Sequence, residues 1–345
     1  MDLITPAALR PGATIALISP SARMNDLVSH RIERTAAFFS SRGLRTTVLY
    51  TPLPSDASLQ LSIETRVDEI HRAFSDPTIP AIVCTIGGST CNEILPHIDY
   101  DLIRSHPKIF CGYSDITLLC YAFYVKSGLR TFYGPTAITQ WGEYPAPHSF
   151  TADNFFKTVM PGVGKPVGQL PCSETWIEEA LDLVSPAESQ RPRALKSNAG
   201  WKWLRAGRAS GKLLAACLSS LLRIIGTEYD IPSYNGVILL LELPMGPNDG
   251  PVSIANAKGW ISNLALHGVF KRIAGLVLGR SFGYSEEMYE KWEGYLLEVV
   301  SQTQFPILSR VDVGHTDPIL TLPFGAESRM DNVNGVWEIL ESGVK

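Results

Sequence analysis

The first 140 or so residues alternate short apolar runs with segments of helical periodicity, and this alternation restricts the fold more than any other feature. The expected strands are Thr14–Ile18, Thr46–Tyr50 and Ala81–Ile86, and the expected helices are about Asp26–Ser41 and Glu64–Phe74. Strands that alternate with helices form a parallel sheet covered on both faces, with function at the carboxyl ends of the strands. The sequence therefore predicts an N-terminal α/β domain. Residues at such strand ends are Ser19, Gly87 to Ser89, and Ser114.

The composition narrows the class of protein. A chain of 345 residues with 45% hydrophobic and 19% charged residues is typical of a soluble globular protein of two domains. It contains no apolar run of about 20 residues and no leader pattern at its N-terminus, so we expect a cytoplasmic protein without a membrane partner. A net charge of −4 with dispersed basic residues argues against a nucleic-acid polymer as partner.

Cysteine spacing and glycine motifs argue against a metal or a cofactor. The six cysteines show no C-x-x-C spacing, and several lie in apolar patterns, as reduced buried thiols do. The sequence has no Gly-x-Gly-x-x-Gly and no Walker lysine, which leaves dinucleotide binding and nucleotide hydrolysis poorly supported. We expect a small-molecule substrate, with no metal and no cofactor.

The periodicity fades between about Pro145 and Gly200, where prolines recur, and a second patterned region follows. We therefore predict an N-terminal domain over residues 1–145, a linker with an inserted substrate loop over 146–206 and a C-terminal α/β domain over 207–345. The strands expected in that domain begin at 209, 237, 273, 307, 319 and 336, and its helices span about 254–267 and 285–300.

The segment Lys108–Thr117 has the pattern of a nucleophile elbow. A short apolar run meets a Gly-x-Ser turn at Ser114, and a helical pattern follows. Such a turn lifts a serine hydroxyl clear of the sheet and aims the next amide at a developing oxyanion. The same pattern also occurs at ordinary helix N-caps. Gly87–Ser89 likewise fits a tight turn, a phosphate cradle or a second oxyanion donor.

A serine nucleophile needs a base and a carboxylate that orients the base. Among seven histidines, His315 lies in a loop between two apolar strands, where its ring can project into a cleft. Glu242 ends a run of five apolar residues, a costly place for a carboxylate unless it is paired or lies at the mouth of a strand. A structural role remains open for both residues. The other histidines have helical patterns or prolines around them: His30, His71, His97, His106, His148 and His267.

Four motifs in order along the chain resemble the LD-carboxypeptidase family of serine peptidases. They are Ile86-Gly87-Gly88, P-K-x-x-x-G-Y-S-D-I-T ending at Thr117, Leu240-Leu241-Glu242, and Gly314-His315-x-x-Pro318 followed by Leu322-Pro323-Phe324-Gly325. The resemblance implies Ser114 as nucleophile, His315 as general base and then acid, and Glu242 as orienting carboxylate. It also implies an oxyanion hole formed by the backbone amides of Gly88 and Asp115.

The resemblance carries further expectations about fold and substrate. It implies a flavodoxin-like or glutamine-amidotransferase-like N-terminal domain, a C-terminal domain around a small barrel, and a cytoplasmic homodimer. The long insert is similar to that of the branch containing the microcin C self-immunity peptidase, which cleaves amides of aminoacyl-nucleotide-like molecules. An aromatic side chain of the insert would then stack on the base. The candidate substrate-binding residues are Gly87, Trp176, Trp201, Trp203, Cys217 and Ser219.

The pattern departs from the family at Ala215–Ser219, where members usually read G-G-N-L-S. Cys217 cannot replace the donors and acceptor of an amide, which puts the familiar substrates in doubt. We predict a serine hydrolase that cleaves an amide of a peptide-like or aminoacyl-nucleotide-like small molecule. The alternatives are a murein tetrapeptide LD-carboxypeptidase, a divergent hydrolase or acyltransferase of specialised metabolism, and a catalytically silent ligand-binding protein.

Overall fold

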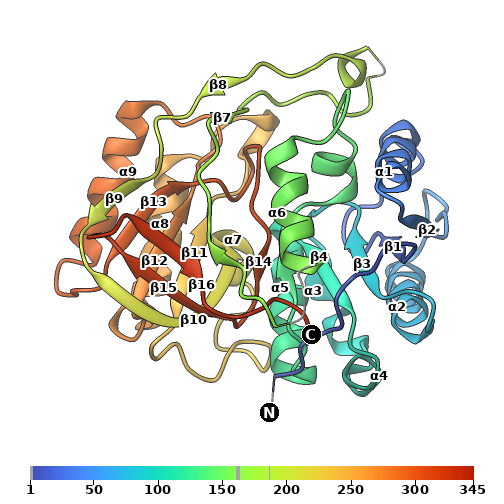
Figure 1. Cartoon of the computed structure of the whole chain (residues 1–345), viewed down its shortest axis with the longest axis horizontal. Helices are drawn as coiled ribbons and strands as arrows, with labels where there is room; N and C mark the ends of the chain where they lie inside the picture. Colours follow the sequence, from blue (N-terminus) through green and yellow to red (C-terminus); the bar gives the residue numbers. More distant parts are fainter. Residues whose placement is uncertain (1–2, 161–163, 186) are drawn as a thin grey trace.

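The computed structural model describes residues 3–160, 164–185 and 187–345. One part of the molecule is a six-stranded sheet in the order β14–β5–β4–β3–β1–β2, and all neighbours except β14 and β5 run parallel (Figure 1). Its strands are β1 (Thr14–Ile18), β2 (Arg45–Leu49), β3 (Ala81–Cys84), β4 (Ile109–Gly112), β5 (Phe132–Tyr133) and β14 (Leu322–Pro323). The parallel α/β arrangement expected for this region is confirmed.

Helices cover both faces of this sheet because its buried strands alternate between two apolar clusters. In β1, Ile15 and Leu17 pack in the cluster that contains Phe39, whereas Ala16 and Ile18 pack in the cluster that contains Phe74. These two aromatic residues come from α1 and α2, which therefore lie on opposite faces. The helices of this part are α1 (Ser29–Ser41), α2 (Leu59–Ser75), α3 (Cys91–Ile94), α4 (Tyr100–Ser105) and α5 (Thr117–Ala122).

The second sheet has eight strands in the order β6–β16–β15–β10–β11–β12–β13–β9, and it curls beside the first (Figure 1). Its central strands β10 to β13 run parallel, and the outer pairs are antiparallel. The strands are β6 (Gly168–Gln169), β9 (Lys202–Arg205), β10 (Arg208–Cys217), β11 (Ile238–Glu242), β12 (Gly275–Gly279), β13 (Ile307–Val311), β15 (Glu327–Asp331) and β16 (Val336–Ile339). Its helices are α7 (Leu218–Leu221), α8 (Ile254–Leu266) and α9 (Glu286–Val299).

The two sheets share one core. The cluster that holds α2 and α5 continues through α7 to α8 and α9, and the Cys217 amide donates to the Thr117 hydroxyl across the seam at 3.0 Å. The chain also crosses the seam, because β14 pairs with β5 of the first sheet. The strand expected near 319–322 is therefore misplaced, since it spans Leu322–Pro323 and completes the N-terminal sheet. The predicted domain boundaries stay a prediction.

Residues 146–206 contain more regular structure than the fading periodicity indicates. They include α6 (Ser149–Val159), which the sequence analysis does not predict, and a two-stranded ribbon of β7 (Thr175–Trp176) and β8 (Lys196–Ser197), which runs above both sheets in Figure 1. The buried face of α6 includes the polar residues Thr151 and Asn154, which break its apolar pattern. Thr151 accepts from the Ile319 amide at 3.0 Å, and Asn154 donates to the Phe150 carbonyl at 2.9 Å. Among the helices that the structure describes, none combines the length and the apolar character needed to cross a bilayer.

Candidate active site

Ser114 lies at a sharp turn directly after β4. Its φ of 63° is in the left-handed region, and a single 3-10 turn from Ser114 to Ile116 leads into α5. A left-handed serine between a strand and a helix is strained, and such strain is held where the surrounding structure fixes it. Gly112 permits the close approach, since a Cβ there would lie 2.9 Å from an Ile116 methyl group. The strand, turn and helix expected around Ser114 are present.

His315 and Glu242 meet Ser114 at the seam between the sheets. The His315 Nε2 atom lies 3.0 Å from Ser114 Oγ, and its Nδ1 atom lies 2.8 Å from Glu242 Oε2. Glu242 ends β11 with a fully buried side chain, and the His315 side chain is 11% exposed. Gly314, at φ 115°, allows this approach, because a Cβ there would lie 2.9 Å from the same carboxylate oxygen. The three residues form a hydrogen-bonded chain from hydroxyl to imidazole to carboxylate.

Tyr133, which the sequence analysis misses, ties the carboxylate to the nucleophile. Its hydroxyl donates to Glu242 Oε1 at 2.7 Å and accepts from the Ser114 amide at 3.2 Å. Burial and then the charge of Glu242 raise the pKa of Tyr133 well above its usual range, so the phenol keeps its proton and remains a donor. Tyr133 belongs to the first sheet and Glu242 to the second, so this contact fixes the two halves of the triad relative to one another.

The loop that carries Gly88 packs against the other side of Ser114. A Cβ on Gly87 would lie 2.8 Å from Ser114 Cβ and 3.3 Å from the Asp115 amide nitrogen. Gly88 has φ 149°, and a Cβ there would lie 2.4 Å from Ser21 Oγ. Only glycines therefore bring this backbone so close to the nucleophile.

Asp115 anchors that loop through its side chain. Its fully buried carboxylate accepts from Ser21 Oγ and, at 2.9 Å, from the Cys91 amide. Arg223, from the second half of the molecule, forms an ion pair with Asp115 and also donates to the Ser89 carbonyl at 2.9 Å. The guanidinium thus joins the 3-10 turn of Ser114 to the loop of Gly88, a contact with no signal in the sequence because its partners lie more than a hundred residues away.

Cys217 and Ser219 lie behind the triad and do not line the cavity that opens at Ser114. Cys217 is 1% exposed and pairs in register with Glu242, and its Sγ lies 3.5 Å from Ser219 Oγ. Burial raises the pKa of the Cys217 thiol well above its usual range, and Glu242 adds to this effect, so the thiol stays protonated. The Cys217 side chain, which was expected to face substrate, is buried and is not among the described residues that line the cavity.

The three candidate tryptophans also lie outside that cavity. Trp176 stacks beneath Arg280 at 4.8 Å, Trp201 donates to Asp312 at 2.9 Å, and Trp203 packs on the apolar cluster of the second sheet. Their rings therefore pack against the insert and the outer strands. An indole, which has an apolar ring and one N–H donor, serves such a structural role as readily as it binds a ligand.

The cavity at Ser114 has a volume of about 890 Å³ and is bounded by the insert. Residues 180–184 of the insert supply one wall, and the catalytic turn and the loop of Gly87 and Gly88 supply the floor. The side chains that sequence reasoning missed here are Ala22, Met24, Ile86, Tyr113, Thr139, Ala180, Leu181, Asp182, Leu183, Val184, Met245, Asn248, Asp249 and Phe282.

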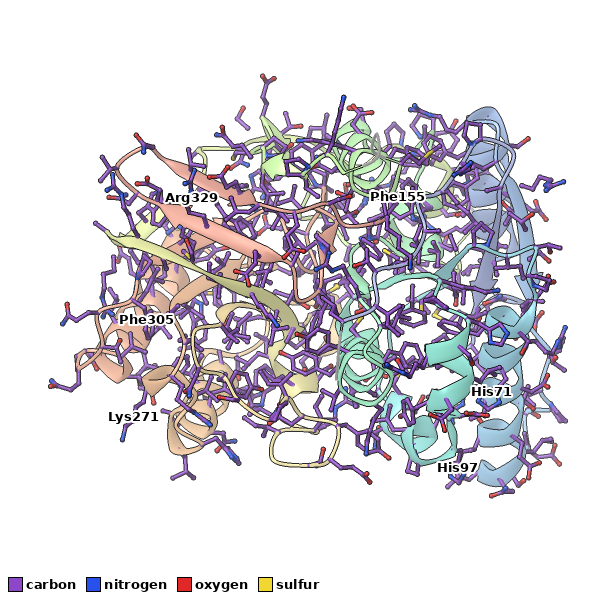
Figure 2. The ribbon with its side chains drawn as sticks, turned by 60° about the horizontal axis from the view of Figure 1, so that its bottom comes forward. His71, His97, Phe155, Lys271, Phe305 and Arg329 are labelled. Carbon is purple, nitrogen blue, oxygen red and sulfur yellow. The ribbon has the colours of Figure 1, made fainter. Side chains whose placement is uncertain are left out.

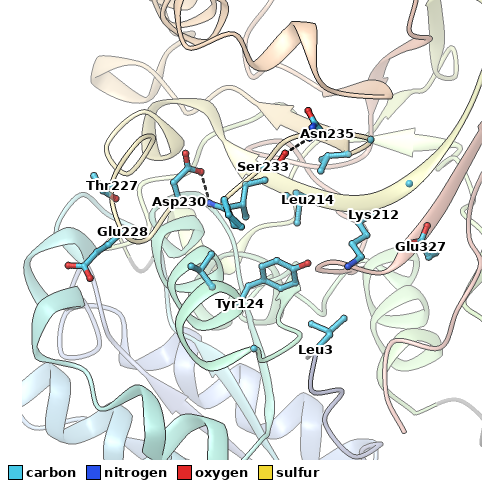
Figure 3. A pocket seen from close by; sticks show the side chains of 17 residues that line it. Leu3, Tyr124, Lys212, Leu214, Thr227, Glu228, Asp230, Ser233, Asn235 and Glu327 are labelled. Carbon is cyan, nitrogen blue, oxygen red and sulfur yellow. Dashed lines mark hydrogen bonds between the residues drawn. The ribbon is translucent and has the colours of Figure 1, made fainter. Parts of the chain in front are cut away.

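A second hollow of about 730 Å³ lies at the seam away from the triad, between Tyr124 and Leu3 on one side and Lys212 and Leu214 on the other (Figure 3). Among the described residues that line the cavity at Ser114, the one histidine is His315, so the other histidines lie elsewhere. His71 and His97 lie together at one end of the molecule, and His71 accepts from the Asp99 amide at 2.9 Å (Figure 2). The described residues contain no cluster of three or more metal-ligating side chains.

The chain matches one peptidase family over both halves. Residues 15–134 match the LD-carboxypeptidase N-terminal domain, and residues 210–330 match the LD-carboxypeptidase C-terminal domain. The fold and the strand-end site are those of a hydrolytic α/β enzyme. The chain belongs to the LD-carboxypeptidase family, and it is a serine-type peptidase or hydrolase.

Relatives match over nearly the whole length. The microcin C7 self-immunity protein MccF of Escherichia coli is 32% identical over 97% of this chain and 95% of its own. The "Probable murein peptide carboxypeptidase" of Bacillus subtilis is 25% identical over 98% and 95%. The structure of MccF with glutamyl sulfamoyl guanosine superposes with a TM-score of 0.88 at 30% identity, covering 99% of each chain. MccF with aspartyl sulfamoyl adenosine gives the same TM-score.

Proposed function

We propose that this protein is a serine hydrolase that cleaves an amide bond of a peptide-like or aminoacyl-nucleotide-like small molecule through an acyl-enzyme on Ser114. The observation that carries the proposal is the continuous hydrogen-bonded chain from Ser114 through His315 to Glu242. A serine hydroxyl becomes an effective nucleophile when an adjacent imidazole takes its proton and a buried carboxylate stabilises the imidazolium.

The reaction follows from the positions of these groups. Ser114 Oγ attacks the carbonyl carbon while its proton passes to His315 Nε2, and the backbone amides of Gly88 and Asp115 receive the negative charge that develops on the carbonyl oxygen. The C–N bond then breaks, and His315 returns the proton to the leaving amine. Water, deprotonated by His315, attacks the acyl-enzyme and releases the acid and free Ser114.

The substrate class rests on the relatives. MccF has been solved with acylated sulfamoyl nucleosides, and the cavity beside Ser114 is large enough for a molecule of that kind. Murein peptides are the second candidate, favoured by the murein peptide carboxypeptidase among the relatives. A cytoplasmic location and a homodimer follow from the family resemblance and are tested by cell fractionation and sedimentation velocity.

The direct test uses a fluorophosphonate probe and turnover measured by mass spectrometry. We expect the probe to label the wild type on Ser114 and to leave Ser114→Ala unlabelled. The turnover panel holds an LD-tetrapeptide of murein, aspartyl sulfamoyl adenosine and C-terminally blocked dipeptides. Turnover retained by Ser114→Ala at more than about one part in a thousand would exclude the proposed nucleophile.

A further inference from the structure

The cavity wall beside Ser114 is apolar and carries no free positive charge. Its lining includes the apolar side chains of Met24, Leu181, Leu183, Met245 and Phe282. The charged side chains among the described residues that line it, apart from His315 of the triad, are the carboxylates Asp182 and Asp249, and no lysine or arginine is among them.

The arginines nearest to this wall already have carboxylate partners. Arg31 and Arg193 border the adjoining part of the site, next to Tyr113 and His315. Arg193 lies 2.7 Å from Glu143 and 2.5 Å from Asp317, and Arg31 lies 3.3 Å from Glu143. These side chains are at most 12% exposed, so the pairs are shielded from solvent. The charges of both guanidiniums are thus balanced by Glu143 and Asp317, although Arg31 Nη1 and Arg193 Nε are buried without a hydrogen-bond partner.

Another acidic side chain at this border is also paired. Glu179 lines the same part of the site and forms an ion pair with Arg191 at 2.5 Å. A substrate carboxylate placed in this cavity would therefore find no cation that lacks a carboxylate partner, and it would face Asp182 and Asp249. Burial of an unpaired carboxylate is strongly unfavourable, whereas an uncharged apolar group or a cation meets no such cost.

We propose that this site selects amide substrates whose groups beside Ser114 are uncharged and apolar, or cationic, and that it discriminates against acidic ones. This inference rests on the proposed function and names its substrate class. It separates this protein from MccF, which has been solved with glutamyl and aspartyl ligands that carry a side-chain carboxylate.

The test compares near-isosteric substrates that differ in one charge. For the acyl side of the scissile bond, a glutamyl arylamide is compared with the glutaminyl arylamide. For the amine side, a Leu-Leu dipeptide is compared with its C-terminal carboxamide. We expect kcat/KM for the uncharged member to exceed that for the acidic member by at least about tenfold in one pair or both. Equal rates, or a preference for the acidic members, would overturn the inference.

A charge placed in the wall supplies the reciprocal test. Met245→Lys should raise kcat/KM for the acidic member relative to the uncharged one by about tenfold, because it provides the missing cation. Met245→Gln, of similar length and without charge, is the matched control and should leave the ratio unchanged. Equal ratios in the two variants would contradict the inference.

The fluorophosphonate probe separates failure of this inference from failure of the proposed function. If the probe labels Ser114 but none of the four compounds is turned over, the inferred substrate class is wrong. Ser114 would still be a reactive nucleophile, as the proposed function requires. Absence of both labelling and turnover overturns the proposed function itself.

Discussion

The floor and the wall of the active-site cavity are built in different ways. The floor rests on a network that joins Ser114 and His315 to Glu242 and Tyr133 behind them, and every polar atom that links these residues is fixed by a hydrogen bond of 3.2 Å or less. The wall at residues 180–184 belongs to an insert without regular structure there, and Val184 is 44% exposed. Ion pairs of Arg193 hold that insert near the site.

This difference indicates that the chemistry and the choice of substrate depend on separate parts of the chain. The floor cannot change without disturbing the core that both sheets share. The wall can change its side chains at little cost in stability, because it is half-exposed and held by a few contacts. Substitutions in the floor should therefore lower kcat, whereas substitutions that loosen the wall should raise KM.

The largest expected effect comes from the base. His315→Gln removes the proton acceptor from Ser114, so we expect kcat to fall by about 10⁴-fold or more while KM changes by less than about threefold. Steady-state kinetics on the best substrate of the panel measures both values. A fall of less than about tenfold in kcat would mean that His315 is not the base.

Arg223→Met should give the next largest effect, because it leaves the Asp115 carboxylate buried without its cation and frees the carbonyl of Ser89. We expect kcat to fall by about 10- to 100-fold with little change in KM. Displacing an oxyanion donor should lower kcat less than removing the donor altogether. Lys126→Met is the matched control, since Lys126 pairs with Glu228 between the same two halves, is half-buried like Arg223, and does not line the cavity at Ser114. Equal kinetics for the two variants would refute the positioning role of Arg223.

Tyr133→Phe should lower kcat by about tenfold, because a hydrogen bond to a buried carboxylate is lost while the ring and its packing are kept. Tyr121→Phe serves as control, since Tyr121 is equally buried in α5 but lies outside the site. Thermal unfolding of both variants checks that the fold is retained. An unchanged kcat in Tyr133→Phe would show that Glu242 needs no second donor.

Local pattern was enough to propose Ser114, Glu242 and His315, which the structure joins through hydrogen bonds. Ser114 follows a strand at a Gly-x-Ser turn, Glu242 ends an apolar run, and His315 lies in a loop between strands, so each has a signal within ten residues of its own position. The parallel sheet was predictable for the same reason. Tyr133 and Arg223 were not, since their partners are 109 and 108 residues away and their own neighbourhoods show only burial or surface charge.

The wall was also beyond prediction from the sequence. Trp176, Trp201 and Trp203 are the conspicuous aromatics of the insert, yet an indole that packs on a cation or on a strand has the same local pattern as one that binds ligand. The unremarkable stretch at 180–184 faces the cavity instead. Helix α6 was missed because Thr151 and Asn154 are buried through hydrogen bonds that depend on tertiary contacts or on the helix itself.

The smallest expected effect on turnover concerns the wall. Although burial opposes it, pairing with Asp317 and Glu143 raises the pKa of Arg193, so this guanidinium stays charged and bridges the insert to the loop of His315. We expect Arg193→Met to raise KM by about three- to tenfold with kcat within twofold, because the insert loosens while the triad is kept. The free energy of unfolding should also fall by about 3 kcal/mol, since the buried Asp317 loses its cation and Glu143 keeps only Arg31. Arg191→Met, which breaks the more exposed pairs with Glu179 and Glu188, should leave the free energy of unfolding nearly unchanged, because solvent screens these charges. A fall in kcat with an unchanged KM in Arg193→Met would mean that the wall helps to hold the triad, and the separation of floor from wall would then fail.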